Sequence, residues 1–401
     1  MAKPNTLADE LVGRAMSQLS TSWQFKLPRL RTIQKYRNLE NGYLEPRKRV
    51  QFNVPIPIFS GMIDTLQADL NDKLIVKYDY SDPADFKVCE KLNAFIKQTS
   101  TSARSGAQWD KKFRQFRHEM ILSGRGILRF TSSKDDGYTN DLSVVPFEDF
   151  YFEPMGGGSL ENHLFTGQGN IYKTKAELKK GAEDGIYDKG QVAKIISSGS
   201  DYKMAGIWDT NVDFGNRFRP LGLEPESNPY TGSAIFNLCE WILEDKGKRW
   251  YILLDAYSGQ WLRFEKWEDI DSSSLYPWMS AASHEDIKNF ASKSFADDLY
   301  PVADSIITLF NQELTNRQKR NLNAKAYDKT MFKDLTKLDE AQYRPDALVP
   351  VETFGGTRRI SEGIFSFETP TLTGTVDLIS WLSQDTGNNP GVTDIQQGQA
   401  A

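Results

Sequence analysis

The sequence has few of the residues that bind transition metals or form disulfides. Its 401 residues include two cysteines, Cys89 and Cys239, and three histidines, His118, His163 and His284. Each cysteine lies in an apolar periodic stretch, so we predict two buried thiols in a reducing compartment rather than a disulfide framework. With so few histidines and no Cys-x-x-Cys pair, neither a metal site nor a Ser/His/Asp triad is expected. We therefore predict a protein without a cofactor and without enzymatic activity.

Three short motifs approach catalytic signatures, and each lacks a required residue. The stretch 185–190 has the glycine spacing of a phosphate-binding loop, but Gln191 stands where that loop needs a lysine. His284 and Glu285 begin like a zinc-protease helix, yet no second histidine follows four residues on. Residues 157–161 lack the last glycine of a nucleophile elbow. None of these three active sites is present.

Long hydrophobic runs are also absent. Even the apolar stretch 234–243 is interrupted by Asn237 and Glu240, and it is far shorter than the roughly 20 apolar residues that cross a bilayer. No apolar core of a secretory signal follows Met1, so we expect the protein to be made in the cytoplasm. The net charge of −5 is small for this length, which means that any contact with nucleic acid has to be local.

The pattern that is present is typical of an α+β protein. Apolar residues at helical spacing predict helices over 58–70, 86–97 and 109–123, and helical pieces between 6 and 45 that are broken at Pro28. Alternating residues predict a hairpin from 127–131 and 142–145 and a three-stranded meander over 234–265. A capping box is expected at 174–177, a flexible glycine segment at 156–159 and a long polar loop at 197–232.

The last hundred residues differ from the rest. Val302, Ile306, Phe310 and Leu314 repeat every four residues after Pro301, which predicts a long helix over 301–326 with Pro301 in its first turn. A strand-prone segment at 327–368 and a second helix at 371–383 should follow, before a polar tail.

One segment carries an excess of positive charge. Between 317 and 337 there are two acids, Asp328 and Asp334, and seven basic residues: Arg317, Lys319, Arg320, Lys325, Lys329, Lys333 and Lys337. The last four lysines are each four residues apart, so a continuous helix would place them on one face. Such a stripe is commonly a solvated helix face. In a ring of identical subunits it would instead form stacked positive rings, which could meet DNA phosphates without reading bases.

Several segments follow one another in the order found in a known family. They are an Arg-x-x-x-Asn strand and helix at 49–70, a helix-to-strand step at 120–130, and an aromatic and acidic segment at 145–154. A Lys-x-Glu-type helix follows at 174–180, and a Gly-Val motif lies at 386–392. In these features the chain resembles the portal proteins of tailed double-stranded DNA bacteriophages, as a pattern that extends over nearly the whole sequence.

The resemblance implies a portal-like α+β subunit with an α/β wing, long stem helices and a small clip, assembled into a ring of about twelve copies. Carried onto this sequence, the parts are the wing at 1–295, the first stem helix at 296–326, the clip at 327–369, the second stem helix at 370–386, and the start of a tunnel loop or a truncated tail at 387–401. Portal proteins normally continue into another long helix and a crown. The sequence stops where the tunnel loop would begin, so it is either truncated or a short variant.

The function implied by the resemblance is that of a head-to-tail connector. The ring would sit at one capsid vertex of the virion and conduct double-stranded DNA during packaging and ejection, without sequence specificity and without a membrane span. Its implied partners are the major capsid protein, the terminase motor and later a tail adaptor protein. The residues expected to contact phosphates are Arg317, Lys319, Arg320, Lys325 and Lys329.

A Mg²⁺-dependent nuclease remains an alternative function. The adjacent acids Asp297 and Asp298, or Asp339 and Glu340, offer the oxygen ligands that Mg²⁺ prefers. Adjacent acids are, however, more typical of the N-termini of helices.

A scaffold protein of a tail or baseplate is the other alternative. The meander is rich in aromatic residues, with Trp241, Trp250, Trp261 and Trp267 as candidates for a ligand platform. Aromatic side chains on strands are more typical of a hydrophobic core.

Overall fold

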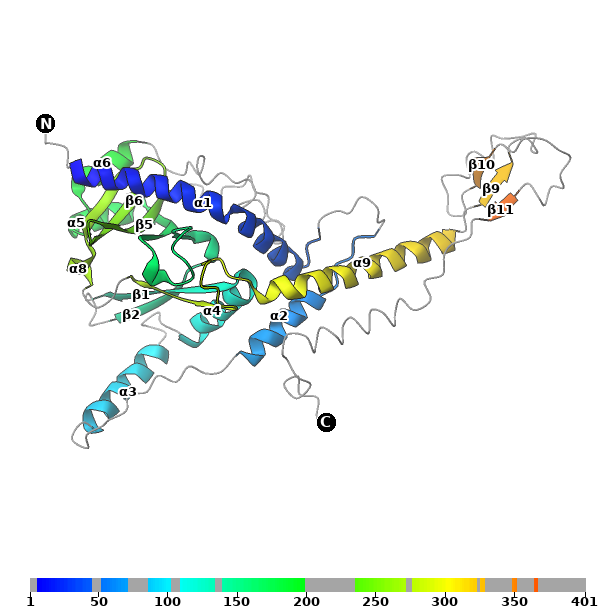
Figure 1. Ribbon diagram of the computed structural model, residues 1–401, viewed down its shortest axis with the longest axis horizontal. Helices are drawn as coiled ribbons and strands as arrows, with labels where there is room; N and C mark the ends of the chain where they lie inside the picture. The colour runs from blue at the N-terminus through cyan, green and yellow to red at the C-terminus, as the bar shows by residue number, and fades with distance from the viewer. Residues whose placement is uncertain are drawn as a thin grey trace. The chain divides into compact units, whose positions relative to one another are not determined.

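The structure is a computed structural model that describes most of the chain. The described residues are 6–44, 52–70, 86–101, 109–133, 139–198, 235–271, 276–322, 325–328, 348–351 and 364–366. They form helices and sheets in the order shown in Figure 1, which confirms the α+β class. The chain divides into two compact units, of which the first is built from 1–41 and 60–298 and the second from 42–59 and 299–401.

A five-stranded antiparallel sheet forms the centre of the first unit. Its strands, in spatial order, are β3 (Phe150–Phe152), β4 (Phe165–Thr174), β5 (Ile235–Asp245), β6 (Lys248–Asp255) and β7 (Trp261–Lys266). The last three strands confirm the predicted meander. The four tryptophans proposed as a platform, three in these strands and Trp267 directly after them, are buried or partly buried against the hydrophobic core, so they do not form an exposed platform.

A three-stranded antiparallel sheet lies in the same unit. Its order is β2 (Thr139–Val144), β1 (Arg125–Ser133) and β8 (Trp278–Ala282). Strands β1 and β2 confirm the predicted hairpin. Strand β8 comes from a distant part of the sequence and pairs with the other edge of β1, which leaves β8 at the edge of this sheet.

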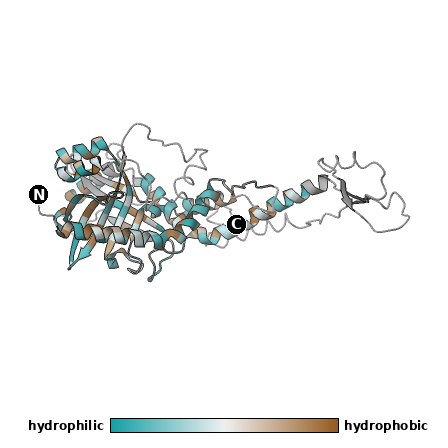
Figure 2. Ribbon diagram, turned by 90° about the horizontal axis from the view of Figure 1, so that it is seen from above, coloured by the Kyte–Doolittle hydropathy of each residue, from teal (hydrophilic) through white to brown (hydrophobic). Residues whose placement is uncertain are grey.

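The long helix α1 (Thr6–Glu40) packs on the five-stranded sheet (Figure 1). Its residues Leu11, Ala15 and Leu19 are fully buried in one cluster with Trp241 and Leu254 of the sheet. Hydrophobic and hydrophilic segments alternate along α1 and the other helices of this unit in Figure 2, as expected for helices with one buried face.

The predicted break at Pro28 is wrong, because α1 continues through this residue. A proline removes the N–H that would bond the carbonyl four residues earlier. That carbonyl belongs to Gln24, and both Gln24 and Pro28 are exposed, so water can replace the missing donor. Buried side chains on either side, such as Trp23 and Ile33, hold the two halves of the helix on the same core.

Further helices complete the first unit. They are α2 (Ile58–Asp69), α3 (Phe86–Thr101), α4 (Trp109–Ser123), α5 (Lys175–Glu183), α6 (Lys189–Ser197), α8 (Trp267–Ile270), and the short 3₁₀ helices η2 (Phe147–Asp149) and η3 (Leu160–Asn162). Those at 58–69, 86–101, 109–123 and 175–183 lie where helices were predicted, and the others were not predicted. Helix α2 also contributes its first residues to the second unit. The predicted capping box is present, since Thr174 Oγ1 accepts from the Glu177 N–H at 3.3 Å and the Glu177 carboxylate accepts from the Thr174 N–H at 2.7 Å.

The two cysteines lie in different environments. Cys239 is fully buried, and burial raises the pKa of its thiol well above the ordinary value. Cys89 is only half-buried on α3, so the prediction of a buried thiol is correct for Cys239 and wrong for Cys89. The amphipathic pattern of α3 predicted the helix correctly but not the depth of its burial.

Gly124, between α4 and β1, is a position where we expect a side chain to destabilise the fold. Its φ is +89°, and a Cβ there would lie 2.2 Å from the carbonyl oxygen of Ser292. Gly124→Ala should therefore lower the free energy of unfolding by about 2 kcal/mol in chemical denaturation. Gly13→Ala is the matched control, because Gly13 lies within α1 with nothing near a new Cβ and alanine favours helix. A loss no larger at Gly124 than at Gly13 would contradict this account.

The second unit contains most of α9 (Phe295–Leu322) and a small sheet. That sheet has the order β10 (Leu348–Val351), β9 (Lys325–Asp328) and β11 (Ile364–Ser366), with β10 parallel and β11 antiparallel to β9. The predicted strand-prone segment thus contains strands, and Pro350 lies in an edge strand where its missing N–H is tolerated. The predicted second stem helix at 370–386 lies outside the described residues.

The long helix starts within one residue of the predicted first stem helix at 296–326 but before the start at 301 that the apolar repeat indicates, and its predicted end is wrong. The helix begins six residues before Pro301, which lies inside it, and it ends at Leu322 rather than at 326. The earlier start follows from a capping interaction between Ser294 and Asp297, which the apolar repeat does not reveal. Within the described residues, no helix is both long enough and apolar enough to cross a membrane.

Candidate nucleic-acid interface

The start of α9 is fixed by a capping box in the first unit. Asp297 Oδ2 accepts from the Ser294 N–H at 2.7 Å, and Ser294 Oγ accepts from the Asp297 N–H at 3.1 Å. The other carboxylate oxygen, Oδ1, accepts from Arg29 Nη1 at 2.7 Å and from the Tyr36 hydroxyl at 2.5 Å. Asp297 therefore joins the beginning of α9 to α1.

These contacts weaken the nuclease alternative. Both carboxylate oxygens of Asp297 are already hydrogen-bonded, and Asp298 forms an exposed ion pair with Lys293 at 2.5 Å. Asp339 and Glu340 lie outside the described residues. In the part of the chain that the structure covers, no group of three or more acidic, histidine or cysteine side chains is placed to hold a metal ion.

Asp297 should make the stability of the fold sensitive to acid. Burial opposes ionisation, but hydrogen bonds from Arg29, Tyr36 and Ser294 outweigh it and lower the pKa of Asp297 from 3.8 to about 2. A carboxyl with a lowered pKa stabilises the fold above its unfolded pKa, and this contribution is lost as the pH falls through the folded value. We expect Asp297→Asn to cost about 2 kcal/mol near pH 6, and the difference from wild type to shrink between about pH 4 and pH 2.

Urea denaturation across this pH range measures the effect. Asp298→Asn is the matched control, since the neighbouring Asp298 is about half exposed and its ion pair is of the kind that contributes little. Equal losses for the two variants at neutral pH would show that the contacts of Asp297 do not stabilise the start of α9.

In the second unit, one face of α9 is buried along most of its length. The buried residues are Leu299, Ala303, Ile306, Ile307, Asn311 and Thr315. The Asn311 amide binds the backbone of Val54 in both directions, with Nδ2 donating to its carbonyl at 3.1 Å and Oδ1 accepting from its N–H at 2.8 Å. Phe59 and Tyr300 pack edge to face nearby, with ring centroids 6.1 Å apart. These contacts hold the segment before α2 against α9.

The predicted phosphate-contacting residues begin where the apolar stripe of α9 ends. Arg317 is exposed and pairs with Glu313 one helical turn earlier at 3.0 Å. Lys319 and Arg320 follow in the last turns of α9. Glu313 offsets part of the charge of Arg317. The four-residue spacing of this pair is visible in the sequence, but the count of charges from 317 to 337 leaves Glu313 out.

The condition for a lysine stripe, a continuous helix through the four lysines, is not met at the first of them. Lys325 lies in strand β9, after the helix has ended at Leu322. The four-residue spacing of the lysines therefore does not place Lys325 and Lys329 on one helix face. Lys329 lies outside the described residues, as do the other two lysines of the stripe. The structure thus brings Arg317, Lys319 and Arg320 together on α9 and assigns Lys325 to the small sheet.

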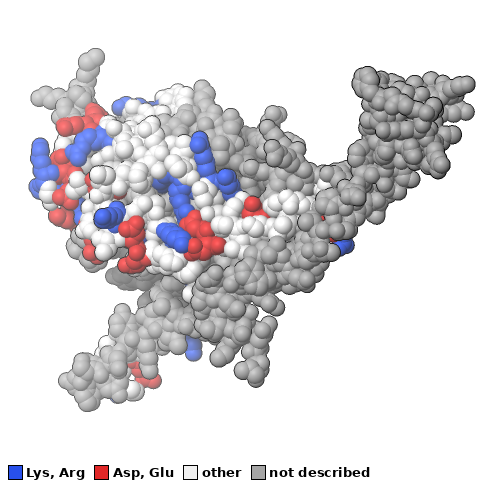
Figure 3. All heavy atoms as spheres, turned by 45° about the vertical axis from the view of Figure 1, so that its right-hand side comes forward, with Lys and Arg blue, Asp and Glu red and all other residues white. Residues whose placement is uncertain are grey.

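The surface of the first unit shows no comparable basic segment on the face seen in Figure 3. Basic and acidic side chains are interspersed there. The sequence 185–190, which resembles a phosphate-binding loop, forms the turn before α6, where the Asp188 carboxylate accepts from the Gln191 N–H at 2.9 Å. This segment therefore caps the N-terminus of a helix, with the Asp188 side chain bonded to the N–H of Gln191.

Sequence reasoning missed one hollow in the first unit. It has a volume of about 520 Å³ and brings together Arg125 with residues from 158–162 and from 276–287. These three stretches are far apart in the sequence and carry no shared motif, so no local signal could have indicated the pocket.

No protein-family model matches this sequence, and no curated protein shows significant similarity to it. The resemblance to portal proteins therefore depends on the order of the elements and on the segments quoted for it.

Proposed function

We propose that this protein is a portal-type connector subunit, which forms a ring at one capsid vertex and conducts double-stranded DNA. The observation that supports the proposal best is the course of α9. This helix has a buried stripe from Leu299 to Thr315, continues through Arg317, Lys319 and Arg320, and is followed within three residues by a small sheet. A body, a long helix and a small sheet follow one another in the same order as the wing, stem and clip of portal proteins.

The dimensions of α9 suit a stem. Its 28 residues correspond to about 42 Å at the usual helical rise. In a ring, identical copies of Arg317, Lys319 and Arg320 would lie at one height around the axis. Each copy would offer cations to the phosphates of a central duplex, and such contacts do not read the base sequence.

The remaining parts of the subunit would provide the surfaces that contact partner proteins. The small sheet of β9, β10 and β11 would dock the terminase motor and later the tail adaptor protein, and the first unit would face the major capsid protein. The chemical work of packaging would belong to the motor. The subunit itself would act as a passive conduit in the virion.

Electron microscopy of the purified chain tests the proposal. We expect rings with a central hole wide enough for a duplex, and a mass of several subunits in solution. A monomer in solution and within its particle would overturn the proposal, as would a fibre or a trimer.

A charge variant tests the binding of DNA separately from assembly. Replacing Arg317, Lys319 and Arg320 by alanine should leave the rings intact. It should weaken binding to a DNA duplex by about tenfold or more and reduce the slope of log affinity against log salt, by about 0.9 for each phosphate that is no longer neutralised. Fluorescence anisotropy at several salt concentrations measures both quantities.

The matched control removes the same charge from another helix. Lys175, Lys179 and Lys180 are exposed on α5 in the first unit, and their replacement by alanine should leave DNA affinity nearly unchanged. Equal losses of DNA affinity in the two triple variants would mean that binding depends on the net charge of the protein alone. The end of α9 would then have no particular role in binding.

A further inference from the structure

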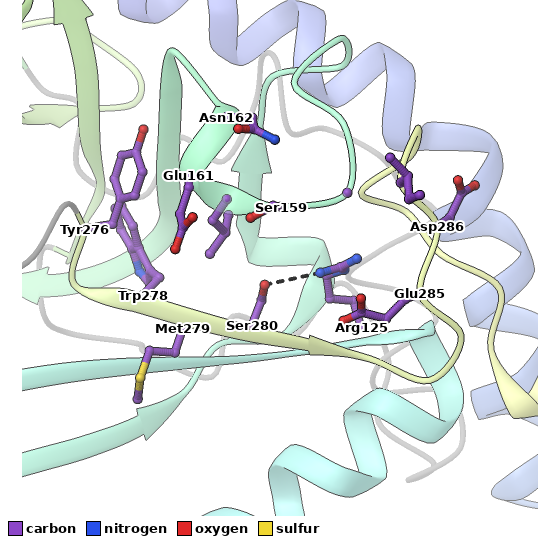
Figure 4. A pocket seen from close by; sticks show the side chains of 13 residues that line it. Arg125, Ser159, Glu161, Asn162, Tyr276, Trp278, Met279, Ser280, Glu285 and Asp286 are labelled. Carbon is purple, nitrogen blue, oxygen red and sulfur yellow. Dashed lines mark hydrogen bonds between the residues drawn. The ribbon is translucent and has the colours of Figure 1, made fainter.

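The pocket beside Arg125 is enclosed by three parts of the first unit. One wall is the segment 158–162, the floor includes strand β8, and the segment 285–287 closes the other side. Figure 4 shows Arg125 and Ser280 joined by a hydrogen bond at the bottom of the hollow, with Ser159 and Glu161 above them.

The glycine segment that forms part of this wall is closely packed, so the prediction of a flexible segment at 156–159 is wrong. The Gly158 N–H donates to the Ile287 carbonyl at 2.9 Å, and a Cβ on Gly158 would lie 1.8 Å from the Asp286 carbonyl oxygen. His163 is buried beside this segment. Its Nε2 lies 3.1 Å from the Gly157 carbonyl oxygen, and its Nδ1 accepts from the Glu153 N–H at 3.1 Å. The pocket is thus preformed.

Arg125 is an unusual residue for such a position. It is only 4% exposed, and its guanidinium carbon lies 4.3 Å from the centre of the Phe290 ring. Nη1 donates to Ser280 Oγ at 3.2 Å, while Nε has no hydrogen-bond partner among the described residues. A guanidinium carries five N–H donors, so donors remain on Arg125 that an incoming group could use.

No carboxylate within the described ranges forms an ion pair with Arg125. Burial lowers the pKa of this guanidinium, and the charge of Glu285 at longer range opposes the shift. Buried charges in proteins are as a rule paired, because an unpaired one loses its hydration without compensation. The pocket therefore contains a buried cation with which an incoming anion could form an ion pair.

We propose that this pocket binds a carboxylate on an apolar-flanked peptide segment of a partner protein, with Arg125 pairing with the carboxylate. A guanidinium fork matches a carboxylate in a bidentate geometry, and Ser159 and Ser280 add hydroxyl groups nearby. The apolar flank would lie on Met279 and Ile287, which line the pocket and are 57% and 93% exposed. This inference does not depend on the proposed connector function.

The charges around the pocket favour a carboxylate over a phosphate. Glu161, Glu285 and Asp286 also line it, so the fixed charge of the lining is negative apart from Arg125. A phosphate near its second ionisation would carry more negative charge into this surrounding than a carboxylate does. Repulsion by the three acids therefore favours a singly charged anion over a doubly charged phosphate.

Ligand-observed NMR with the full chain tests the proposal. The probe is the peptide acetyl-Ala-Ala-Leu with a free carboxylate, and its C-terminal amide, acetate and inorganic phosphate are the comparisons. We expect the free peptide to bind at least about tenfold more tightly than the amide, acetate or phosphate. Tighter binding of phosphate would assign the pocket to a phosphorylated ligand and overturn the proposal. Equal binding of acetate and the peptide would overturn the peptide as occupant, and absence of peptide binding would overturn the site.

Variants separate a ligand-binding role of Arg125 from a structural one. Arg125→Met keeps much of the side-chain volume and should weaken peptide binding by about tenfold or more, while the melting temperature stays equal to or above that of wild type because a buried unpaired charge is removed. Glu161→Gln, at an exposed position, should tighten peptide binding by a few-fold, since one repelling carboxylate is lost. Should Arg125→Met fail to fold, the Glu161→Gln variant still decides, because unchanged or weaker binding there contradicts the charge argument. Unchanged binding in a folded Arg125→Met protein would equally overturn the proposal.

Discussion

We expect Lys26→Ala to lower the free energy of unfolding by about 4 kcal/mol, because it leaves three carbonyl groups without their donor. Lys26 lies in α1 and is fully buried. Its ammonium donates to the carbonyl oxygens of Phe147, Glu148 and Phe150 at 3.4, 2.9 and 2.5 Å. The three donors of the ammonium group thus meet three acceptors of the turn that contains η2 and leads into β3.

The aromatic surroundings of Lys26 add to this interaction. The ammonium lies 3.9 Å from the centre of the Tyr151 ring, within the range of a cation–π interaction, and Lys26 is fully buried. Lys26→Met should restore part of the missing packing but none of the hydrogen bonds, so its cost should fall between that of alanine and wild type. The two variants together separate the effect of side-chain volume from the effect of the donors.

Urea denaturation measures these losses, and α1 offers a matched control. Lys35 lies on the same helix and is exposed, so Lys35→Ala should change stability by less than about 0.5 kcal/mol. Similar results for Lys26→Ala and Lys35→Ala would mean that the turn at 147–150 finds other donors when the ammonium is removed.

Local patterns in the sequence predicted most of the helices of the first unit. Helix α4 has the predicted bounds, Trp109–Ser123, because an apolar residue recurs at helical spacing and Gly124 ends the run. The capping box at Thr174 was predicted because it depends on two side chains three residues apart. Such signals are short in range, so a single sequence contains all of their parts.

The missed strands had no such signal. All three residues of β3 are buried, so the strand lacks the alternation of a sheet with one exposed face. Strand β4 contains Gly167 and Gly169 and has an irregular register between Gln168 and Ile171. Gly167 is needed because a Cβ there would lie 2.1 Å from the Trp241 ring. This requirement comes from the neighbouring strand and is not visible in the sequence of β4.

For the candidate sites, the sequence predicted where charge is concentrated but not how the charged side chains are arranged in space. The excess of basic residues after residue 316 is visible in the sequence. Whether Lys325 shares a helix face with its neighbours depends on where α9 ends, and the strand pairing of β9 decides that. The environment of Arg125 depends on segments more than one hundred and fifty residues away, as shown by its contacts with Ser280 and Phe290. Tertiary packing, which a local pattern does not contain, determines both results.

The second large effect is expected at Arg37, near the C-terminal end of α1. Its Nη2 donates to both carboxylate oxygens of Glu119 on α4, at 2.9 and 3.0 Å, and its Nη1 donates to Glu148 in η2. Glu148 is 4% exposed, and both of its neighbours in this cluster are largely buried. One guanidinium therefore pairs with two carboxylates from two other elements.

Arg37→Ala should lower the free energy of unfolding by about 4 kcal/mol at neutral pH, because two buried carboxylates lose their partner. Urea denaturation with Arg31→Ala as control measures the loss, since Arg31 is exposed on the same helix. A cost within about 0.5 kcal/mol of that control would show that water or other side chains replace Arg37.

The pH dependence of this variant distinguishes loss of charge pairing from loss of packing. Burial raises the pKa of Glu119, while Arg37 lowers it and Glu148 raises it further. A carboxyl whose folded pKa is raised binds protons more tightly in the folded state, so its stabilising contribution is present at low pH and is lost as the pH rises through the folded value. Removing Arg37 raises this pKa further. The cost of Arg37→Ala should therefore be smaller near pH 5 than near pH 8, and Glu119→Gln in the same chain should recover part of it. A cost that is independent of pH, and not reduced by Glu119→Gln, would mean that Arg37 contributes through the packing of its side chain rather than through its charge.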